Sequence, residues 1–152
     1  MKRVALINDL SGFGRCSLTA AIPVISTLGV QAVPLPTAVL SAQTGFGDYA
    51  CRDLTPELTS FAEKWGAMDA HFDGIYSGYL ASPEQAELLA QTIDCIAAPD
   101  TLVIVDPVMA DNGIYYSQID ERMCAAFRRL LSRADVITPN ITEAALLALE
   151  RK

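Results

Sequence analysis

The sequence is poor in side chains that bind soft metal ions. Its 152 residues contain one histidine and four cysteines, and none of the cysteines forms a CxxC pair. A structural zinc ion takes four such ligands, usually in closely spaced pairs, so this class of site is excluded. His71 is too isolated in the sequence to suggest a catalytic role. We therefore expect the cysteines to be reduced thiols of a cytoplasmic protein.

Positive charge is scarce as well. The chain has 11 basic and 18 acidic residues, which gives a formal net charge of −7. Nucleic-acid binding normally requires a basic face, and only Arg128 and Arg129 adjoin one another away from the termini. Long apolar runs are missing too, because Asp9 interrupts the first one after a few residues. These absences predict no nucleic-acid partner, no membrane association and no secretory signal.

Two common nucleotide-binding motifs are absent or incomplete. No GxxxxGK[ST] sequence occurs, which excludes a P-loop of the Walker type. Gly12 and Gly14 follow the first apolar run, but Ser17 replaces the third glycine of a dinucleotide fingerprint. Leu35 also stands where such a fold would place an acidic residue at the end of its second strand. A dinucleotide-dependent oxidoreductase is therefore disfavoured.

Short apolar runs alternate with helical patterns along the whole chain. Half of the residues are hydrophobic (51%), which suits one compact domain. Strands are predicted over residues 4–7, 31–35, 74–77, 102–105 and 136–137, and helices over 17–28, 56–65, 82–97, 120–131 and 142–149. Strands separated by helices predict βαβ units and a mainly parallel sheet. Pro34 and Pro36 should end the second strand, and Ser82 and Gln85 should form a capping box.

The loops that follow four of these strands carry the candidate functional residues. They span residues 8–15, 78–80, 106–116 and 138–143. Ligands of α/β proteins bind beyond the carboxyl ends of the strands, so these loops should meet around one site. Acidic residues in two of them could hold Mg²⁺ beside a phosphate, since a hydrated Mg²⁺ needs only one or two protein carboxylates.

Each of these residues also has a purely structural interpretation. Asp106 before a proline and Asp111 before Asn-Gly are both typical of turns. Asn140 could cap a helix, with Glu143 closing its capping box, or both could face a phosphate and metal-bound water. Thr44 could be an ordinary loop residue or a ligand contact.

Taken together and in order, five segments support a family resemblance. They are INDLSGFGRCSLTAAIPVISTLGV, SAQTGFG, SGYLAS, VDPVMADNG and ADVITPNITEAALL. They resemble the pyridoxal kinase family of the ribokinase-like superfamily. Hydroxymethylpyrimidine kinases usually have a GSDSSGGAG-like turn after the first strand, where this chain has NDLSGFGRC. The resemblance implies a ribokinase-like three-layer α/β/α fold, of which residues 1–152 form the N-terminal part of a single kinase domain.

The resemblance also implies a reaction and a substrate site. Members of the family transfer the γ-phosphate of ATP to the 5′-hydroxyl of pyridoxal, pyridoxine or pyridoxamine. By analogy, Ser11 and Thr44 hydrogen-bond the vitamer and Tyr79 lines its pocket. Homodimers are expected for the full-length proteins.

A second group of residues is implied to handle ATP and Mg²⁺. Asp106 and Glu143 resemble the residues that hold the metal ion and its waters, and Asn140 resembles a phosphate contact. Asp111 and Tyr116 lie in the loop that folds over the site in relatives, where Asp111 is a further candidate metal ligand and Tyr116 a candidate ATP contact.

One family feature is absent from this sequence. Members are about twice as long, and their second half carries a Gly-Thr-Gly-Asp motif whose aspartate is the general base. Residues 1–152 contain no such motif. Two alternatives therefore stay open beside a vitamin B6 kinase: a hydroxymethylpyrimidine kinase-like enzyme and a non-catalytic pyridoxal-binding protein.

The missing motif makes a testable prediction. A purified polypeptide of residues 1–152 should not phosphorylate pyridoxal with ATP, because it lacks the expected general base. The measurement is a product assay on material whose intact mass has been verified. Normal kinase activity from a chain of this length would contradict the prediction.

Overall fold

The computed structural model describes residues 1–117 and 119–148. Its helices and strands follow in the order β1 (Arg3–Phe13), α1 (Ser17–Thr27), β2 (Gln31–Ala42), β3 (Cys51–Asp53), α2 (Thr55–Ala67), β4 (Gly74–Ser77), α3 (Pro83–Ile96), β5 (Leu102–Val105), β6 (Ala110–Asp111), β7 (Ile114–Tyr115), α4 (Glu121–Leu130), β8 (Val136–Ile137) and α5 (Ile141–Ala148). Position 149, the predicted end of the last helix, lies outside the described residues. Within the described ranges, no helix is both long enough and apolar enough to cross a bilayer.

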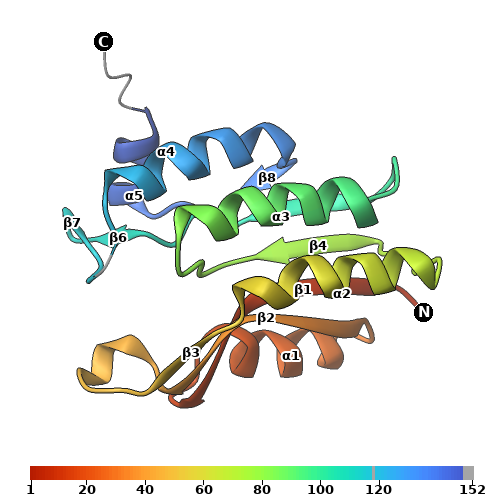
Figure 1. Ribbon diagram of the computed structural model, residues 1–152, viewed down its shortest axis with the longest axis horizontal. Coiled ribbons are helices and arrows are strands. Elements are labelled where there is room, and N and C mark those ends of the chain that lie inside the picture. The colour runs from red at the N-terminus through yellow and green to blue at the C-terminus, as the bar shows by residue number, and fades with distance from the viewer. Residues whose placement is uncertain (118, 149–152) are drawn as a thin grey trace.

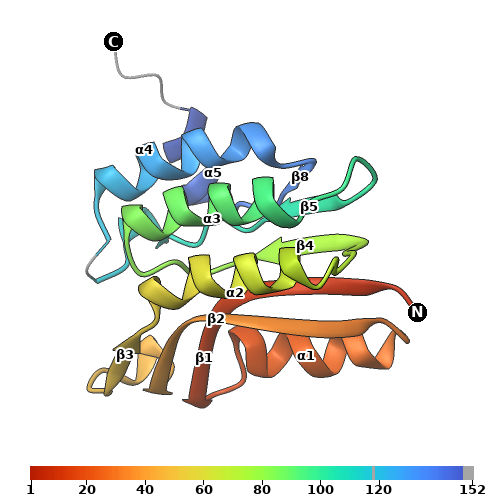
Figure 2. The ribbon, with the colours of Figure 1, turned by 45° about the vertical axis from the view of Figure 1, so that its right-hand side comes forward.

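Six of the strands form one twisted sheet between two layers of helices, and β6 and β7 form a separate antiparallel pair. The order of the six-stranded sheet is β3-β2-β1-β4-β5-β8, and all of its pairs are parallel except β2–β3. Helix α1 lies on one face, and α2, α3 and α4 lie side by side on the other (Figure 1, Figure 2). This arrangement confirms the predicted α/β fold with a mainly parallel sheet.

The two faces of the sheet are covered unequally. On the face of α2, α3 and α4, alternate strand residues such as Ile75 and Val103 join Phe72 and Phe127 in a continuous buried core. Such burial is the main favourable term in folding. On the other face α1 covers β1 and β2, while Leu102 of β5 stays 46% exposed.

The predicted strands 74–77, 102–105 and 136–137 are confirmed at their bounds, whereas β1 and β2 are much longer than predicted. The expected turn at residues 8–15 is wrong up to Phe13, because β1 continues beside β2 after a register shift between Asn8 and Leu10. Pro34 and Pro36 lie inside β2 instead of ending it.

The position of these prolines explains why the strand tolerates them. The amide of Gln31 donates to the carbonyl of Lys2 in the segment before β1, so odd-numbered residues of β2 up to Leu35 direct their amides toward β1. Pro34 and Pro36 therefore face the other side, where β3 pairs only from Ala38 onward. A proline is acceptable in a strand where its missing N–H has no partner to satisfy.

The predicted capping box of α3 is half correct. Ser82 Oγ accepts the amide of Gln85 at 3.2 Å, as predicted. The Gln85 side chain does not return to Ser82: its Oε1 accepts the amide of Ala81, and its Nε2 donates to the carbonyl of Thr37 and to Thr55 Oγ1. This fully buried amide therefore connects α3 to β2 and to the start of α2.

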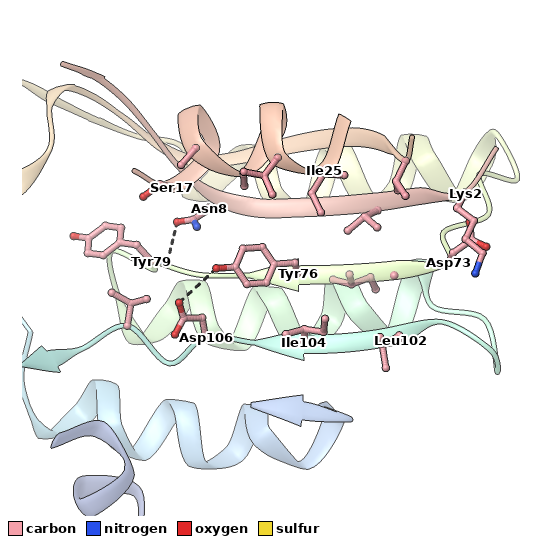
Figure 3. A pocket seen from close by; sticks show the side chains of 18 residues that line it. Lys2, Asn8, Ser17, Ile25, Asp73, Tyr76, Tyr79, Leu102, Ile104 and Asp106 are labelled. Atoms are coloured by element: carbon pink, nitrogen blue, oxygen red, sulfur yellow. Dashed lines mark hydrogen bonds between the residues drawn. The ribbon is translucent and has the colours of Figure 1, made fainter. Parts of the chain in front are cut away.

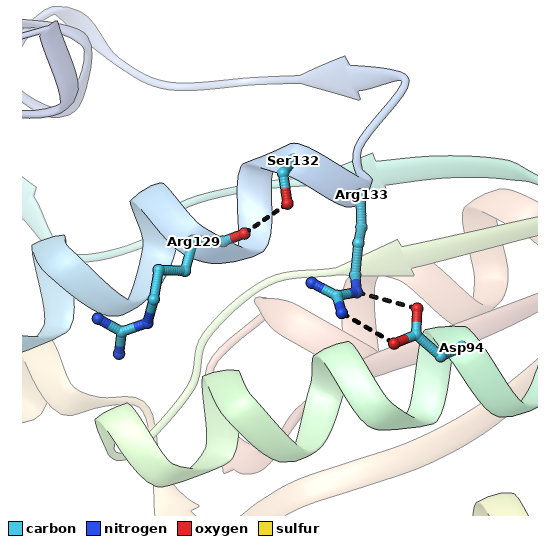
Figure 4. A network of polar contacts seen from close by, with 4 residues as sticks. All are labelled: Asp94, Arg129, Ser132 and Arg133. Carbon is cyan, nitrogen blue, oxygen red and sulfur yellow. Dashed lines mark hydrogen bonds and ion pairs between the residues drawn. The ribbon is translucent and has the colours of Figure 1, made fainter.

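Helices α3 and α4 are also joined at the surface. The guanidinium of Arg133, just after α4, donates from two nitrogens to the two carboxylate oxygens of Asp94, each at 2.9 Å (Figure 4). This bidentate ion pair holds the pKa of Asp94 below its ordinary value. An exposed pair of this kind adds little stability but helps to fix the register of the two helices.

Asn8, directly after the part of β1 that pairs with β4, holds the two strands together where β4 ends. Its Oδ1 accepts the amide of Asp9 and the amide of Tyr79, each at 2.9 Å. Gly78 lies against the same side chain, and a Cβ built there would be 2.2 Å from Asn8 Nδ2. Only glycine therefore lets the chain leave β4 beside this amide.

Substituting Gly78 should test this constraint. We expect Gly78→Ala to lower the free energy of unfolding by about 1–3 kcal/mol, because the added methyl group must displace a buried, hydrogen-bonded side chain. Urea denaturation followed by circular dichroism measures the change.

Gly66 in α2 provides the matched control. A Cβ there would be 3.4 Å from Cys95 Sγ, an ordinary contact, so Gly66→Ala should be neutral or stabilising by up to about 1 kcal/mol. Equal stability of the Gly78→Ala and wild-type proteins would show that the Asn8 contact imposes no such constraint.

Candidate active site

The sheet topology locates the site before any side chain is considered. From β1 the chain proceeds to β2 on one side, and it later returns to β4 on the other side. The crevice outside the carboxyl ends of β1 and β4 is therefore the switch point at which α/β proteins bind ligands. Two cavities of about 680 and 430 Å³ open there, and Ser17, Tyr79 and Val108 line both.

The larger cavity is an apolar groove between α1 and strands β4 and β5 (Figure 3). Val24 and Ile25 line it from the helix, and Tyr76 and Ile104 line it from the sheet. Asp106, directly after β5, is the carboxylate at its end near the switch point (Figure 3). Its volume would suit a large ligand, but its polar groups are concentrated near its two ends.

The smaller cavity brings together the residues expected to bind the substrate. Ser11 from β1, Thr44 from the short helical turn after β2, and Tyr79 from the loop after β4 all line it. Tyr116, expected to contact ATP, lines this same cavity. These residues are far apart in the sequence, and the fold places them around one volume of about 430 Å³.

Tyr79 lies between the two cavities and lines both of them. Burial, and to a lesser extent the negative charges nearby, raise the pKa of its phenol to about 12. Its backbone amide is held by Asn8, and its carbonyl accepts the hydroxyl of Thr37 at 3.1 Å. A tyrosine that stays protonated can stack on an aromatic ligand or donate a hydrogen bond.

Asp9 and Gln43 also line the smaller cavity, and the sequence analysis selected neither of them. Asp9 is 5% exposed, and its Oδ2 accepts the hydroxyl proton of Ser11 at 2.8 Å. Gln43 Oε1 accepts the amide of Gly45 at 3.0 Å, and its side chain fills the space beside Gly14, where a Cβ would meet Gln43 Cγ at 2.8 Å. The available signal was their adjacency to Ser11 and Thr44 in post-strand segments.

Asp106 is the acidic residue at the carboxyl end of the central strands. Its amide donates to the carbonyl of Ser77, and the hydroxyl of Tyr76 lies 3.5 Å from Oδ2 (Figure 3). Burial and the negative charge of Glu143 raise the pKa of this carboxyl above its ordinary value. A half-buried carboxylate with such a pKa gains from a nearby cation.

Asn140 and Glu143 form the predicted capping box at the start of α5. Asn140 Oδ1 accepts the amide of Glu143 at 3.0 Å, and Glu143 Oε2 accepts the amide of Asn140 at 2.9 Å. Glu143 Oε1 accepts the amide of Met109 at 3.1 Å, and Asn140 Nδ2 donates to the carbonyl of Ala110. The structural interpretation of this pair is thus confirmed, and the pair also anchors the loop after β5.

Asp111 lies apart from this buried pair. It is exposed at the tip of the β6–β7 hairpin, where both of its oxygens accept hydrogen bonds from Asn112. Its charge still reaches the cavity, because the pKa of Tyr116 is raised by burial and by Asp111, Glu143 and Asp106 in that order. Across residues 1–117 and 119–148, no three histidine, cysteine or acidic side chains are grouped to hold one metal ion.

Comparison with known proteins shows the family of this chain. The family model described as phosphomethylpyrimidine kinase matches residues 14–152. The chain belongs to this family. A pyridoxine/pyridoxal/pyridoxamine kinase of Bordetella pertussis is 33% identical over 146 residues, which cover 90% of this chain and 50% of that protein.

Two solved structures share the fold of this chain, and both are described as kinases. A putative phosphomethylpyrimidine kinase of Bacteroides thetaiotaomicron, crystallised with pyridoxal, has 44% identity and a TM-score of 0.93 over 96% of this chain and 51% of its own. Leishmania donovani pyridoxal kinase, solved with ADP and pyridoxamine, has 27% identity and a TM-score of 0.90 over 97% of this chain and 53% of its own. The resemblance to pyridoxal kinases and the ribokinase-like fold are thereby confirmed, and the chain spans about half the length of these relatives.

The raised pKa of Asp106 predicts that ionisation of this carboxyl destabilises the fold. Because its folded-state pKa lies above the ordinary 3.8, ionisation of Asp106 weakens the fold as the pH rises through that window. We expect Asp106→Asn to raise the melting temperature near neutral pH and to lose this advantage as the pH falls toward 3.8. Thermal melts over this pH range provide the measurement.

Asp94→Asn is the control, because Arg133 lowers the pKa of Asp94 instead of raising it. That variant should be no more stable than wild type near neutral pH. An Asp106→Asn protein that melts below wild type near neutral pH would contradict the assignment of Asp106 as an electrostatically strained carboxylate.

Proposed function

We propose that this chain is the substrate-binding half of a kinase that phosphorylates the 5′-hydroxyl of a vitamin B6 vitamer with ATP. The observation that carries this proposal is the pair of adjoining cavities at the switch point: Ser11, Thr44 and Tyr79 line the smaller one, and Asp106 and Tyr79 line the larger one. An aromatic ring of vitamer size suits a volume of about 430 Å³ that is lined by Tyr79, Tyr116 and several polar groups.

Asp106 fits a role toward Mg²⁺ better than its acidic neighbours do. It is half-buried, and its raised pKa reflects a negative charge that a cation would relieve. Glu143 already accepts backbone amides through both oxygens, so its proposed role is through metal-bound water, and Asp111 contributes longer-range charge. When bound, the metal ion would neutralise charge on the transferred phosphate.

The same residues suggest where ATP would lie. Asn140 stands directly before α5, and a helix start favours a phosphate; Tyr116 lines the smaller cavity from the segment after β7. Phosphoryl transfer depends mainly on positioning and charge neutralisation. We propose that the general base comes from a segment outside residues 1–152, and that the complete enzyme is a cytoplasmic homodimer.

A second candidate substrate has specific support. The matching family model carries the name phosphomethylpyrimidine kinase, and the amide of Gln43 could recognise a pyrimidine edge as well as a pyridine. Hydroxymethylpyrimidine therefore remains the alternative acceptor for the same phosphoryl transfer.

Substrate assignment can be tested on the natural polypeptide with ATP, Mg²⁺ and each acceptor in turn. Pyridoxal should be phosphorylated in preference to hydroxymethylpyrimidine. Thr44→Ala should raise the KM for pyridoxal about tenfold and leave the KM for ATP unchanged, because one hydrogen bond to the vitamer is lost.

Thr59 on the exposed side of α2 supplies the matched control, and Thr59→Ala should leave both constants unchanged. Exclusive phosphorylation of hydroxymethylpyrimidine would decide for the alternative. An equal rise of both KM values in Thr44→Ala would argue against a substrate contact at this position.

A further inference from the structure

Tyr79 lies in a segment between β4 and α3 that belongs to no helix or strand. Both polar groups of its backbone are bonded to side chains. Its amide donates to Asn8 Oδ1 at 2.9 Å (Figure 3), and its carbonyl accepts the hydroxyl of Thr37 at 3.1 Å. The place of this tyrosine at the two cavities therefore depends on side chains of β1 and β2.

Thr37 lies at a bulge in β2. Between the pairs Asn8–Pro36 and Leu10–Val39, one residue of β1 lies opposite two residues of β2, and Thr37 is the first of these two. An extra residue of this kind bends a strand and changes the direction of its side chains. The hydroxyl of Thr37 thus contacts the segment after β4, although β1 lies between β2 and β4 in the sheet.

A second buried side chain holds the same segment two residues later. Gln85 Oε1 accepts the amide of Ala81 at 2.7 Å, and Gln85 Nε2 donates to the carbonyl of Thr37 at 2.9 Å. Thr37 and Gln85 are both fully buried. The backbone of Tyr79 is therefore held on both sides by buried groups, and loss of one contact leaves a polar group unpaired.

We propose that Thr37 is a positioning residue for the substrate: its hydroxyl holds the backbone of Tyr79 so that the phenol ring keeps its place against the ring of a B6 vitamer. This inference rests on the proposed function and deepens it. Thr37 lies outside the residues that line either cavity, so it acts on the ligand through Tyr79. A wall residue that is already ordered loses less conformational freedom when a ligand binds, which strengthens binding.

Removal of a single hydroxyl tests the proposal. Thr37→Val removes the donor with little change in shape, whereas Thr37→Ser keeps the donor. Dissociation constants of pyridoxine and of ADP would be measured by calorimetry on the natural polypeptide and on both variants. We expect Thr37→Val to weaken pyridoxine about fivefold and to leave ADP unchanged, and Thr37→Ser to bind pyridoxine within about twofold of wild type.

Thr101 provides the matched control. It is also buried, and its hydroxyl donates to the carbonyl of Phe72 at 2.7 Å, at the amino ends of β4 and β5 and away from the smaller cavity. Thr101→Val should lower stability in urea and leave the affinity for pyridoxine unchanged. Urea denaturation of all variants separates a loss of stability from a loss of binding.

A double-mutant cycle tests the route through Tyr79. Tyr79→Ala removes the phenol ring, so Thr37→Val should not weaken pyridoxine further in that background. Circular dichroism shows whether the double variant is folded.

The possible failures are distinguishable. Wild-type affinity in Thr37→Val, or a loss that persists in the Tyr79→Ala background, would overturn the inference and leave the proposed function intact. An equal loss of affinity in Thr101→Val would also overturn it, because lower stability would then explain the effect. Failure of the wild-type polypeptide to bind pyridoxine, with binding of hydroxymethylpyrimidine instead, would remove the proposed function and this inference together.

Discussion

The site depends on one side-chain amide at the junction of β1 and β4. Asn8 accepts the amides of Asp9 and Tyr79 with one oxygen, so it joins the two strands at the point where the sheet topology opens a crevice. Gly78 is required for this close approach. Through these contacts the same amide sets the direction of β1 toward Ser11 and the placement of the tyrosine that separates the two cavities (Figure 3).

The carboxylates near this junction differ in how far nearby hydrogen-bond donors compensate their negative charge. Glu143 is buried but fully compensated, because backbone amides surround both of its oxygens. Asp106 has only partial compensation and a raised pKa, which makes it the group with most to gain from a cation. Among the described residues, Asp9 has one side-chain donor, because its Oδ2 accepts the hydroxyl proton of Ser11. Acidic residues that lie near one another thus differ in how far their surroundings compensate their charge.

Local sequence signals predicted the elements that local chemistry determines. The strands at 74–77 and 102–105 are short apolar runs bounded by turn residues, and the box of Asn140 and Glu143 depends only on residues three positions apart. The extension of β1 and β2 was not predictable in this way, since each strand is held by the other across about thirty residues of sequence. Pro34 and Pro36 look like strand terminators in the sequence, but the strand tolerates them because the positions of their missing N–H groups face away from β1.

The candidate site was predictable at the level of loops and less so at the level of single side chains. Convergence of the post-strand loops follows from topology, and residues of the predicted loops 8–15, 78–80 and 106–116 do line one cavity, whereas residues 138–143 do not. Asp9 escaped notice because in the sequence it only interrupts an apolar run, and its hydrogen bond to Ser11 exists only in the folded chain. Donor and acceptor polarity decides which ligand edge a wall can meet, so a site read from residue types alone lacks the information that sets its specificity. The folded chain shows this polarity for Asp9 and Ser11 in the smaller cavity.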